Sequence, residues 1–166
     1  MFEAIEMPEN KEDFYRFLVG QGRALTEGEN DVLANLANIA SLLFTAMGEV
    51  NWAGFYIVRG EQLVLGPFMG KPACVRIPLG RGVCGTAAAD RSTQLVKDVH
   101  TFPGHIACDA DSRSEIVVPF VVDGHTVAVL DIDSPVESRF DEQDQKGLEA
   151  LVQMLIERID FDQLTY

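Results

Sequence analysis

The chain has 166 residues, 47% apolar and 23% charged, which is the mixture of a globular protein with room for one domain and its core. Its net charge of −13 argues against nucleic acid and anionic membrane surfaces as partners. No stretch approaches the ~20 apolar residues of a membrane helix, and the acidic residues 1–8 do not resemble a secretory signal. Three cysteines are too few for a disulfide scaffold, so we expect a cytoplasmic protein whose thiols are free at rest.

Apolar periodicity predicts two helices at the start of the chain. Residues 11–20 are expected to form a short helix that ends near Gly20 and Gly22. Residues 29–47 are expected to form a longer amphipathic helix, with Gly48 as its stop. The pattern then changes to aromatic and β-branched residues, which are typical of strands. Strands are expected at residues 51–59, 62–67 and 73–77.

The second half of the chain predicts a hairpin and a closing helix around a long loop. The expected elements are a short helix at 82–89, a short strand at 94–96, a polar loop at 97–113, strands at 115–122 and 126–132 joined by Asp123-Gly124, and a last helix capped by Asp141. A loop of this length inside a compact domain is often functional. The order predicts an α+β fold with helices packed mainly on one side of an antiparallel sheet.

The three cysteines, Cys74, Cys84 and Cys108, lie beside glycines, prolines or histidines rather than inside apolar runs. A cysteine on a reachable turn can act as a thiolate nucleophile, a metal ligand or a partner in disulfide exchange. Redox chemistry needs one thiol that becomes a sulfenic acid and a second that condenses with it to a disulfide. Cys74 and Cys108, on two different loops, fit these two roles, but Cys84 fits them as well. The residues alone therefore do not decide which two cysteines form the disulfide.

Two histidines near Cys108 offer other chemistries. A zinc site is one alternative, with the candidate ligands His100, His105, Cys108 and Asp109. The chain lacks the CxxC pairs that usually mark structural zinc, so we expect no metal. A His105–Cys108 nucleophilic pair for hydrolysis is a second alternative, but it lacks an orienting partner.

Three acidic residues are expected to meet at the end of the predicted hairpin. Asp131 and Asp133 are two residues apart and share one face of a strand. If the strands pair across the turn at 123–124, the numbers of two facing residues add up to about 247. Glu115 then lies opposite Ile132 and beside both aspartates. Carboxylates this close repel one another without a cation, so the group suits an ammonium ion.

Two aromatic residues precede this group on the first predicted strand. Trp52 and Tyr56 are four residues apart and therefore share a strand face. Core packing explains both rings as well as a binding site does.

Eight segments, in this order and spacing, resemble the free methionine-(R)-sulfoxide reductases, which are single GAF-domain enzymes. The segments are residues 51–56, 65–68, 73–78, 80–86, 98–100, 104–109, 114–119 and 129–134. The match extends over residues 29–157, so we expect one GAF domain across residues 1–166, with residues 1–28 as an N-terminal helical extension.

The resemblance implies a six-stranded antiparallel sheet with helices on one face and a loop-covered ligand pocket on the other. It implies reduction of free methionine-(R)-sulfoxide to methionine, without a cofactor. In the family the counterpart of Cys108 attacks the sulfoxide sulfur and that of Cys74 resolves the sulfenic acid as a disulfide. Cys84 matches an accessory cysteine. Thioredoxin is the implied reductant and a homodimer the implied assembly.

The resemblance also assigns substrate-binding residues. Trp52 is implied to lie against the S-methyl group, and the other residues near the ligand are Tyr56, Glu115, Asp131 and Asp133. Backbone N–H groups around Asp109, or a protonated carboxyl, could stabilise the sulfoxide oxygen. The alternative function is a non-catalytic GAF sensor that binds a small ligand.

Overall fold

The computed structural model describes residues 6–164, so the expectation about a secretory signal lies in part outside the described residues. The helices are α1 (Lys11–Leu25), α2 (Val32–Ala46), α3 (Gly82–Asp90) and α4 (Glu142–Arg158), with 3-10 turns η1 (Val99–Thr101) and η2 (Phe161–Leu164). The strands are β1 (Trp52–Arg59), β2 (Gln62–Gly70), β3 (Arg76–Pro78), β4 (Gln94–Val96), β5 (Ser114–Val122) and β6 (His125–Ser134). None of the described helices is long and apolar enough to cross a membrane.

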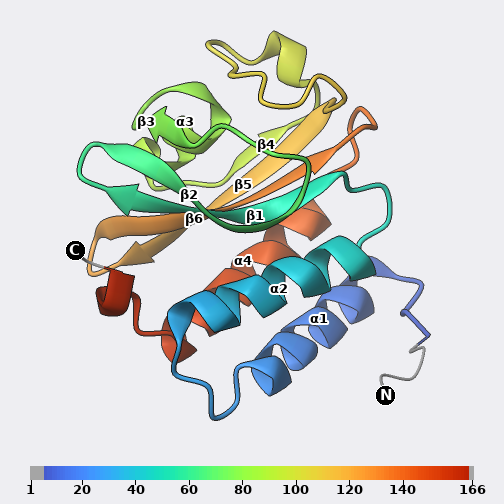
Figure 1. Cartoon of the computed structure of the whole chain (residues 1–166). Helices are drawn as coiled ribbons and strands as arrows, with labels where there is room; N and C mark the ends of the chain where they lie inside the picture. Colours follow the sequence, from blue (N-terminus) through green and yellow to red (C-terminus); the bar gives the residue numbers. More distant parts are fainter. Residues whose placement is uncertain (1–5, 165–166) are drawn as a thin grey trace.

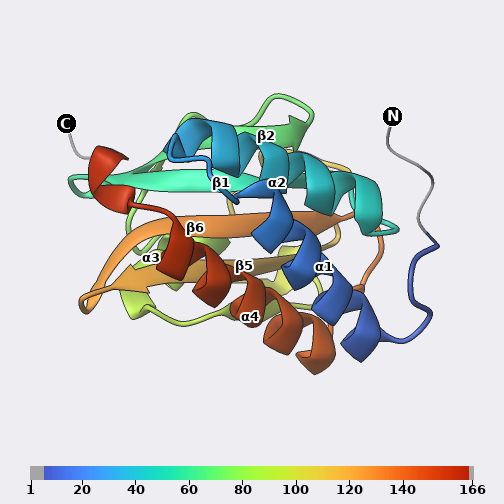
Figure 2. The ribbon, with the colours of Figure 1, turned by 90° about the horizontal axis from the view of Figure 1, so that it is seen from below.

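The six strands form one antiparallel sheet in the order β3-β2-β1-β6-β5-β4. Helices α2 and α4 cover one face of this sheet, with α1 packed against both of them, and α3 and the loop after β4 lie on the other face (Figure 1). The view from below shows α1, α2 and α4 side by side across the strands (Figure 2). The α+β class, the six-stranded antiparallel sheet and the helical layer are therefore confirmed. The short helix predicted at residues 82–89 forms as α3, and it lies on the face of the sheet opposite the other helices (Figure 1).

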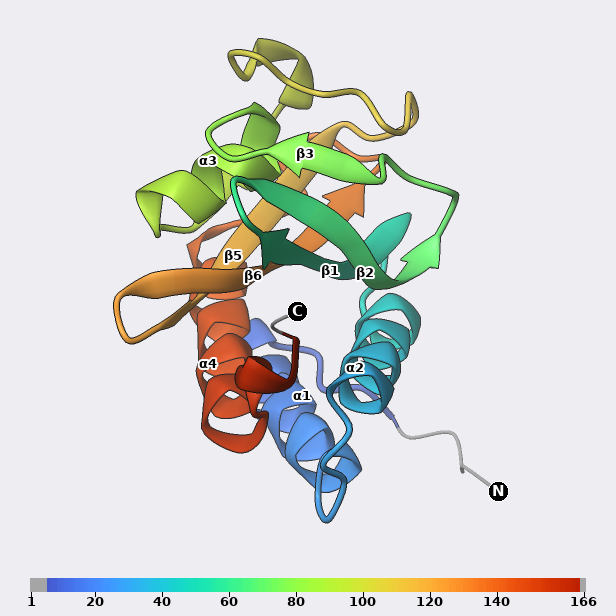
Figure 3. The same ribbon diagram turned by 60° about the vertical axis from the view of Figure 1, so that its left-hand side comes forward.

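Alternation along the strands divides the buried residues into two clusters. On β1, Phe55 packs with the residues under the helices, whereas Trp52 and Tyr56 belong to a smaller cluster on the α3 side. This follows from the two-residue period of a strand, which sends successive side chains to opposite faces. Figure 3 shows the sheet between these two layers.

Helix α1 extends five residues past its predicted end at residue 20. Its N-cap is Asn10, whose side chain accepts a hydrogen bond from the backbone N–H of Asp13. Gly22 is buried inside the helix, where a Cβ atom would meet Met154 and Leu151 of α4 at 2.9 and 3.2 Å. The prediction was wrong because the close approach of two helices, rather than a helix stop, requires this glycine.

The hairpin between β5 and β6 forms as predicted, but its register changes along the ladder. Asp123 and Gly124 both have positive φ angles, as a two-residue hairpin turn requires. A bulge between Phe120 and Val121 shifts the pairing by one residue. Glu115 consequently pairs with Asp133, not with Ile132 as the sequence had predicted.

This shift decides which face carries the acids. Directly paired residues on neighbouring strands point to the same side of a sheet, so pairing of Glu115 with Ile132 would have put Glu115 on the helix-covered face. With the bulge, Glu115 and Asp133 project together into the α3 side. A single extra residue therefore brings the three acids to one surface.

Candidate active site

A disulfide joins Cys74 to Cys108, with their Cα atoms 5.6 Å apart. Cys74 lies in the loop between β2 and β3, because β3 begins at Arg76 rather than at the predicted residue 73. Cys108 lies in the long loop between β4 and β5. Both cysteines are partly exposed, so two loops that are 34 residues apart meet over the α3 side of the sheet.

An aromatic stack forms one wall beneath these loops. The Trp52 indole stacks on both Phe68 and Tyr56. Its ring centroid lies 5.2 Å from that of Phe68 and 5.9 Å from that of Tyr56. Gly54 makes this arrangement possible, because a Cβ atom there would meet the Cβ of Phe68 at 2.3 Å and the Trp52 ring at 2.9 Å. The two rings share one strand face, as their spacing predicts.

Hydrogen bonds from the same two rings hold the loop that carries Cys74. The Trp52 Nε1–H donates to the carbonyl oxygen of Lys71 at 3.1 Å. The Tyr56 hydroxyl donates to the carbonyl oxygen of Cys74 at 2.9 Å. The aromatic wall thus positions the backbone of this cysteine as well as lining the space beneath it.

The acids lie beside the aromatic stack on the same face of the sheet, where Trp52 of β1 pairs with Asp133 of β6. Glu115 and Asp131 are each 6% exposed, and Asp133 is partly buried beside them. Among the described residues, none of the three forms an ion pair with a lysine or an arginine. One carboxylate oxygen, Asp131 Oδ1, is buried without a hydrogen-bond partner in the described structure. Buried polar atoms are rarely left unpaired, so this oxygen points to a ligand.

Burial and mutual repulsion change the protonation of the acids. Loss of water raises the pKa of Asp131 to about 6. Burial, together with the charges of Asp131 and Asp133, raises the pKa of Glu115 well above its usual range. Burial and the neighbouring Asp131 raise the pKa of Asp133 in the same way. Part of this group can therefore hold a proton near neutral pH, while the whole group favours a bound cation.

Cys84 does not lie on an open turn, as the sequence had suggested, but in the first turn of α3. It is 4% exposed, and its Sγ lies 3.8 Å from Glu115 Oε1 as a thiol donor. Burial and the charges of Asp131 and Glu115 raise the pKa of this thiol well above its usual value. A buried, protonated thiol is a poor nucleophile, so the geometry separates Cys84 from the two loop cysteines.

Polar contacts at the rim link the two cysteine loops, and sequence reasoning missed them. Lys71 Nζ lies 2.5 Å from Asp111 Oδ2 and 3.8 Å from Asp109 Oδ1. The Asn51 side-chain amide donates to Asp109 Oδ2 and to Ser112 Oγ, both at 3.3 Å. The available sequence signal for these contacts was the position of the charges. Lys71 is three residues before Cys74, and Asp109 and Asp111 follow Cys108 by one and three residues.

The two histidines do not gather a metal site with Cys108 in this state. The rings of His100 and His105 are 6.5 Å apart, and the sulfur of Cys108 is bonded to Cys74. Burial and the nearby His100 lower the pKa of His105. His105 lines the cavity, whereas His100 is exposed.

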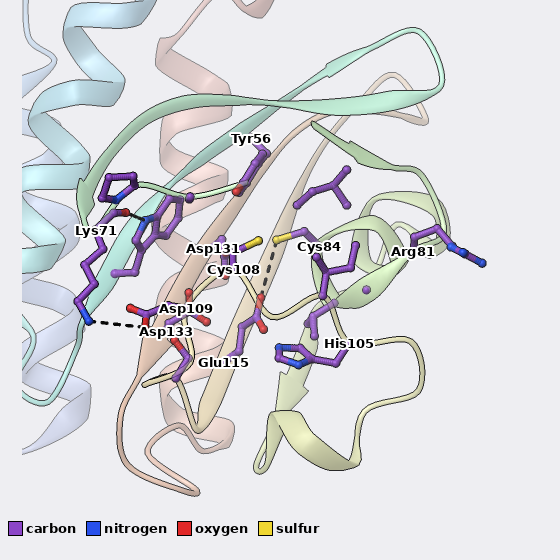
Figure 4. Close-up of a pocket in the computed structure, with 18 residues that line it drawn as sticks. Tyr56, Lys71, Arg81, Cys84, His105, Cys108, Asp109, Glu115, Asp131 and Asp133 are labelled. Atoms are coloured by element: carbon purple, nitrogen blue, oxygen red, sulfur yellow. Dashed lines mark hydrogen bonds and ion pairs between the residues drawn. The ribbon is translucent and has the colours of Figure 1, made fainter. Parts of the chain in front are cut away.

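A cavity of about 40 Å³ lies against these aromatic and acidic side chains (Figure 4). It is lined by both aromatic rings, all three acids, Cys84 and Cys108, together with Asp109 and His105. Apart from Cys74, which lies in the loop above, every residue that the sequence assigned to the site meets at this cavity. An apolar wall, an acidic wall and a sulfur can together hold a small cationic molecule with an apolar end beside a redox-active cysteine.

Comparison with known proteins identifies the family. Residues 20–155 match the model of the GAF domain. The free methionine-R-sulfoxide reductase of Escherichia coli (strain K12) is 55% identical over 146 residues, which cover 88% of this chain and 88% of that protein. The enzyme of that name from Saccharomyces cerevisiae is 44% identical, over 88% of this chain and 86% of the other.

Solved structures agree with the sequence relatives. An X-ray structure of free methionine-R-sulfoxide reductase from Neisseria meningitidis, in complex with its substrate, superposes with a TM-score of 0.91. It is 43% identical and covers 98% of this chain and 99% of that one. With this identity over nearly the whole chain, and with the cysteine pair and the acids at one cavity, the chain belongs to the GAF-domain family of the free methionine-R-sulfoxide reductases.

Proposed function

We propose that this protein reduces free methionine-(R)-sulfoxide to methionine with its own cysteines. The observation that carries the proposal is the meeting of Cys108, an aromatic wall and three carboxylates, one of them with an unpaired oxygen, at one cavity. The names of the Escherichia coli and Saccharomyces cerevisiae relatives, and the substrate complex of the Neisseria meningitidis enzyme, support it.

The reaction that these residues can perform balances in three steps. The Cys108 thiolate attacks the sulfoxide sulfur, and the oxygen passes to Cys108 together with one proton from the site, which yields methionine and a sulfenic acid on Cys108. The Cys74 thiol then condenses with this sulfenic acid, forming the disulfide and releasing water. An external dithiol, which we propose is thioredoxin, reduces the disulfide and is itself oxidised. The Cys74–Cys108 bond corresponds to the state after the second step.

The acids supply selectivity for the free amino acid. Its ammonium group can pair with Glu115, Asp131 and Asp133, and Asp131 Oδ1 has a free lone pair to accept from it. A methionine sulfoxide inside a peptide has no ammonium group, so its binding would leave these buried carboxylates without a cation. Such unpaired groups can reject an analogue strongly.

The remaining residues assist at the sulfoxide group itself. We place the S-methyl group against Trp52, whose indole presents an apolar face to the cavity. Negative charge grows on the sulfoxide oxygen as the thiolate attacks, so a proton or an N–H donor there lowers the barrier. A carboxyl with a raised pKa, such as Glu115, or the backbone around Asp109 fits this role. Cys84 remains an accessory residue in the proposal.

The proposal extends to partners and location. A partly exposed disulfide suits attack by a thioredoxin thiolate, and the cytoplasm is the compartment where such a reductant keeps thiols reduced. We also propose a homodimer. Sedimentation velocity on the reduced protein tests the dimer, and a monomer at micromolar concentration contradicts it.

The decisive experiment maps the disulfide after one turnover. The reduced protein is mixed with one equivalent of free methionine-(R)-sulfoxide without any reductant, and peptide mass spectrometry locates the product. We expect one equivalent of methionine and a Cys74–Cys108 disulfide, with little reaction when the substrate is the N-acetylated sulfoxide. Binding without any methionine formation would instead support a non-catalytic GAF sensor.

A further inference from the structure

Three ligand atoms of a type that binds metal converge at the floor of the cavity. Cys84 Sγ and one carboxylate oxygen each from Glu115 and Asp131 all lie within 4.8 Å of one another, and all three residues are buried. They come from three elements, α3, β5 and β6, so the fold rather than a local turn brings them together. Figure 4 shows Cys84 and Glu115 joined across this floor.

A second observation points to a cation at the same place. Asp131 is 94% buried, since 6% of its surface is exposed, and its Oδ1 has no hydrogen-bond partner among the described residues. An unpaired buried carboxylate oxygen is costly, and a bound cation removes that cost.

One zinc ion fits here when the three ligand atoms, which lie within 4.8 Å of one another, move closer together. Bonds of about 2.3 Å to sulfur and 2.0 Å to oxygen, at tetrahedral angles, place ligand atoms about 3.3–3.5 Å apart. Cys84 Sγ and Glu115 Oε1 are already 3.8 Å apart. A thiolate with two carboxylates is a donor set that borderline-soft divalent ions accept, and water can complete the fourth position.

We propose that the reduced protein binds one Zn²⁺ ion, or a similar borderline-soft divalent cation, through Cys84, Glu115 and Asp131. Binding displaces the proton of the Cys84 thiol to solvent and forms a metal–sulfur bond, without any change in oxidation state. Metal binding does not depend on the reductase activity. If the proposed function also holds, the ion competes with the substrate ammonium for the same carboxylates and inhibits the enzyme.

A cobalt titration tests the site in a protein that keeps Cys84 as its sole thiol. The variant Cys74→Ser/Cys108→Ser retains one of the three cysteines, so a thiolate-to-cobalt charge-transfer band can come from Cys84 alone. We expect this band to saturate at one equivalent of Co²⁺ under anaerobic conditions and to disappear when Zn²⁺ is added. The band is expected to be absent after a further Cys84→Ser change.

Carboxylate variants in the same background test the two oxygen ligands. Asp131→Asn and Glu115→Gln are each expected to weaken Co²⁺ binding at least about tenfold. Substitution of residues that only support the metal ligands already weakens metal binding by this amount, so loss of a direct ligand should do no less. The matched control is Asp111→Asn, an exposed acid at the cavity rim, which we expect to change the affinity less than about twofold.

Circular dichroism and thermal unfolding show whether each variant is folded. If the double serine variant does not fold, Zn²⁺ competition against a chromophoric chelator compares the reduced natural protein with Cys84→Ser alone, and the expected loss is again at least about tenfold. The absence of a charge-transfer band in folded protein overturns the proposal, as does unchanged affinity in both carboxylate variants. None of these measurements uses the sulfoxide, so failure of the metal site is distinguishable from failure of the proposed function.

Discussion

The two faces of the same central strands have opposite chemistry. On β5 and β6 the residues Ile116 and Leu130 turn toward the helices and are fully buried among apolar side chains. Their neighbours Glu115 and Asp131 turn the other way, and they are also buried, but as acids without a basic partner among the described residues. Alternation by one residue therefore separates the larger apolar cluster on the helix face from the acids on the cavity face.

The two faces differ in how burial contributes to the stability of the fold. Apolar burial on the helix face contributes about 25 cal/mol for each Å² removed from water. On the cavity face, burial of carboxylates works against folding, because water is lost and no opposite charge replaces it. Changes to apolar residues on the helix face should therefore alter stability, whereas changes to the cysteines and acids of the cavity face should alter activity with little loss of stability, or with a gain.

The largest effect is expected on the cavity face, from Cys108→Ser. A serine hydroxyl cannot take the sulfoxide oxygen and pass it to a resolving thiol, so we expect turnover to fall at least about 10³-fold. Measured in reducing buffer, where no disulfide contributes, the free energy of unfolding should change by less than about 0.5 kcal/mol. Retention of multiple turnover in this variant would show that another sulfur attacks.

On the helix face, Leu36→Ala should give the reverse result. Leu36 of α2 is fully buried in the larger apolar cluster. We expect a loss of about 2–5 kcal/mol in the free energy of unfolding, from lost burial and the cavity that remains. Urea denaturation measures this loss, and the activity of the folded fraction should stay close to that of the natural protein. A large fall in kcat with unchanged stability would break the division between the faces.

The unpaired acids predict that stability falls as the pH rises from about 4 to 6. The pKa of Asp131 is about 6 in the folded protein and 3.8 as its ordinary value, so the folded state binds more protons in this range. The surrounding titratable groups are Glu115, Asp133, Cys84 and Tyr56, and the raised pKa values of the two carboxyls act in the same direction.

The variant Asp131→Asn isolates this contribution. It removes the buried charge, so at pH 7 we expect the free energy of unfolding to rise by about 1–3 kcal/mol, following ~1.4 kcal/mol for each pKa unit. Substrate affinity should fall at the same time, because the ammonium group loses a partner. The matched control, Asp141→Asn, removes a surface acid whose pKa is lowered to about 2, chiefly by Lys11, and it should not stabilise the protein. A destabilised Asp131→Asn protein at pH 7 would contradict this account.

The smallest effect is expected at the rim, from Lys71→Gln. This exposed lysine links the two cysteine loops through Asp109 and Asp111, and exposed ion pairs contribute little because water and salt screen them. We therefore expect disulfide formation after substrate oxidation to slow by no more than about fivefold. Quenched-flow trapping of thiols measures the rate. A rate that does not change, and that does not depend on salt in the natural protein, would remove Lys71 from the resolving step.

Much of the fold follows from local patterns in the sequence. Asp123-Gly124 predicts the hairpin because both positions need positive φ angles, and the apolar positions of residues 29–47 predict α2. The spacing of Trp52 and Tyr56 places both rings on one face because residues an even number apart on a strand share a face. The choice of Cys74 and Cys108 as the disulfide pair came from family resemblance, since their local context did not distinguish them from Cys84.

What the sequence could not supply depends on contacts between distant residues. The bulge between Phe120 and Val121 has no clear local signal, yet it decides that Glu115 faces the cavity. Gly22 reads as a helix stop until the packing of α1 on α4 is known. The burial of Cys84 depends on how α3 sits on the sheet, so its glycine-rich surroundings were misleading.

One measurement tests most directly the claim that the cavity face performs sulfoxide reduction through Cys108. The reduced Cys74→Ser protein is mixed with excess free methionine-(R)-sulfoxide in the absence of reductant, and methionine and cysteine oxidation are quantified together. We predict one equivalent of methionine per protein and a sulfenic acid on Cys108, trapped by dimedone and located by mass spectrometry. Folded protein that forms no methionine, or that carries the oxygen on Cys84 instead, would contradict the account.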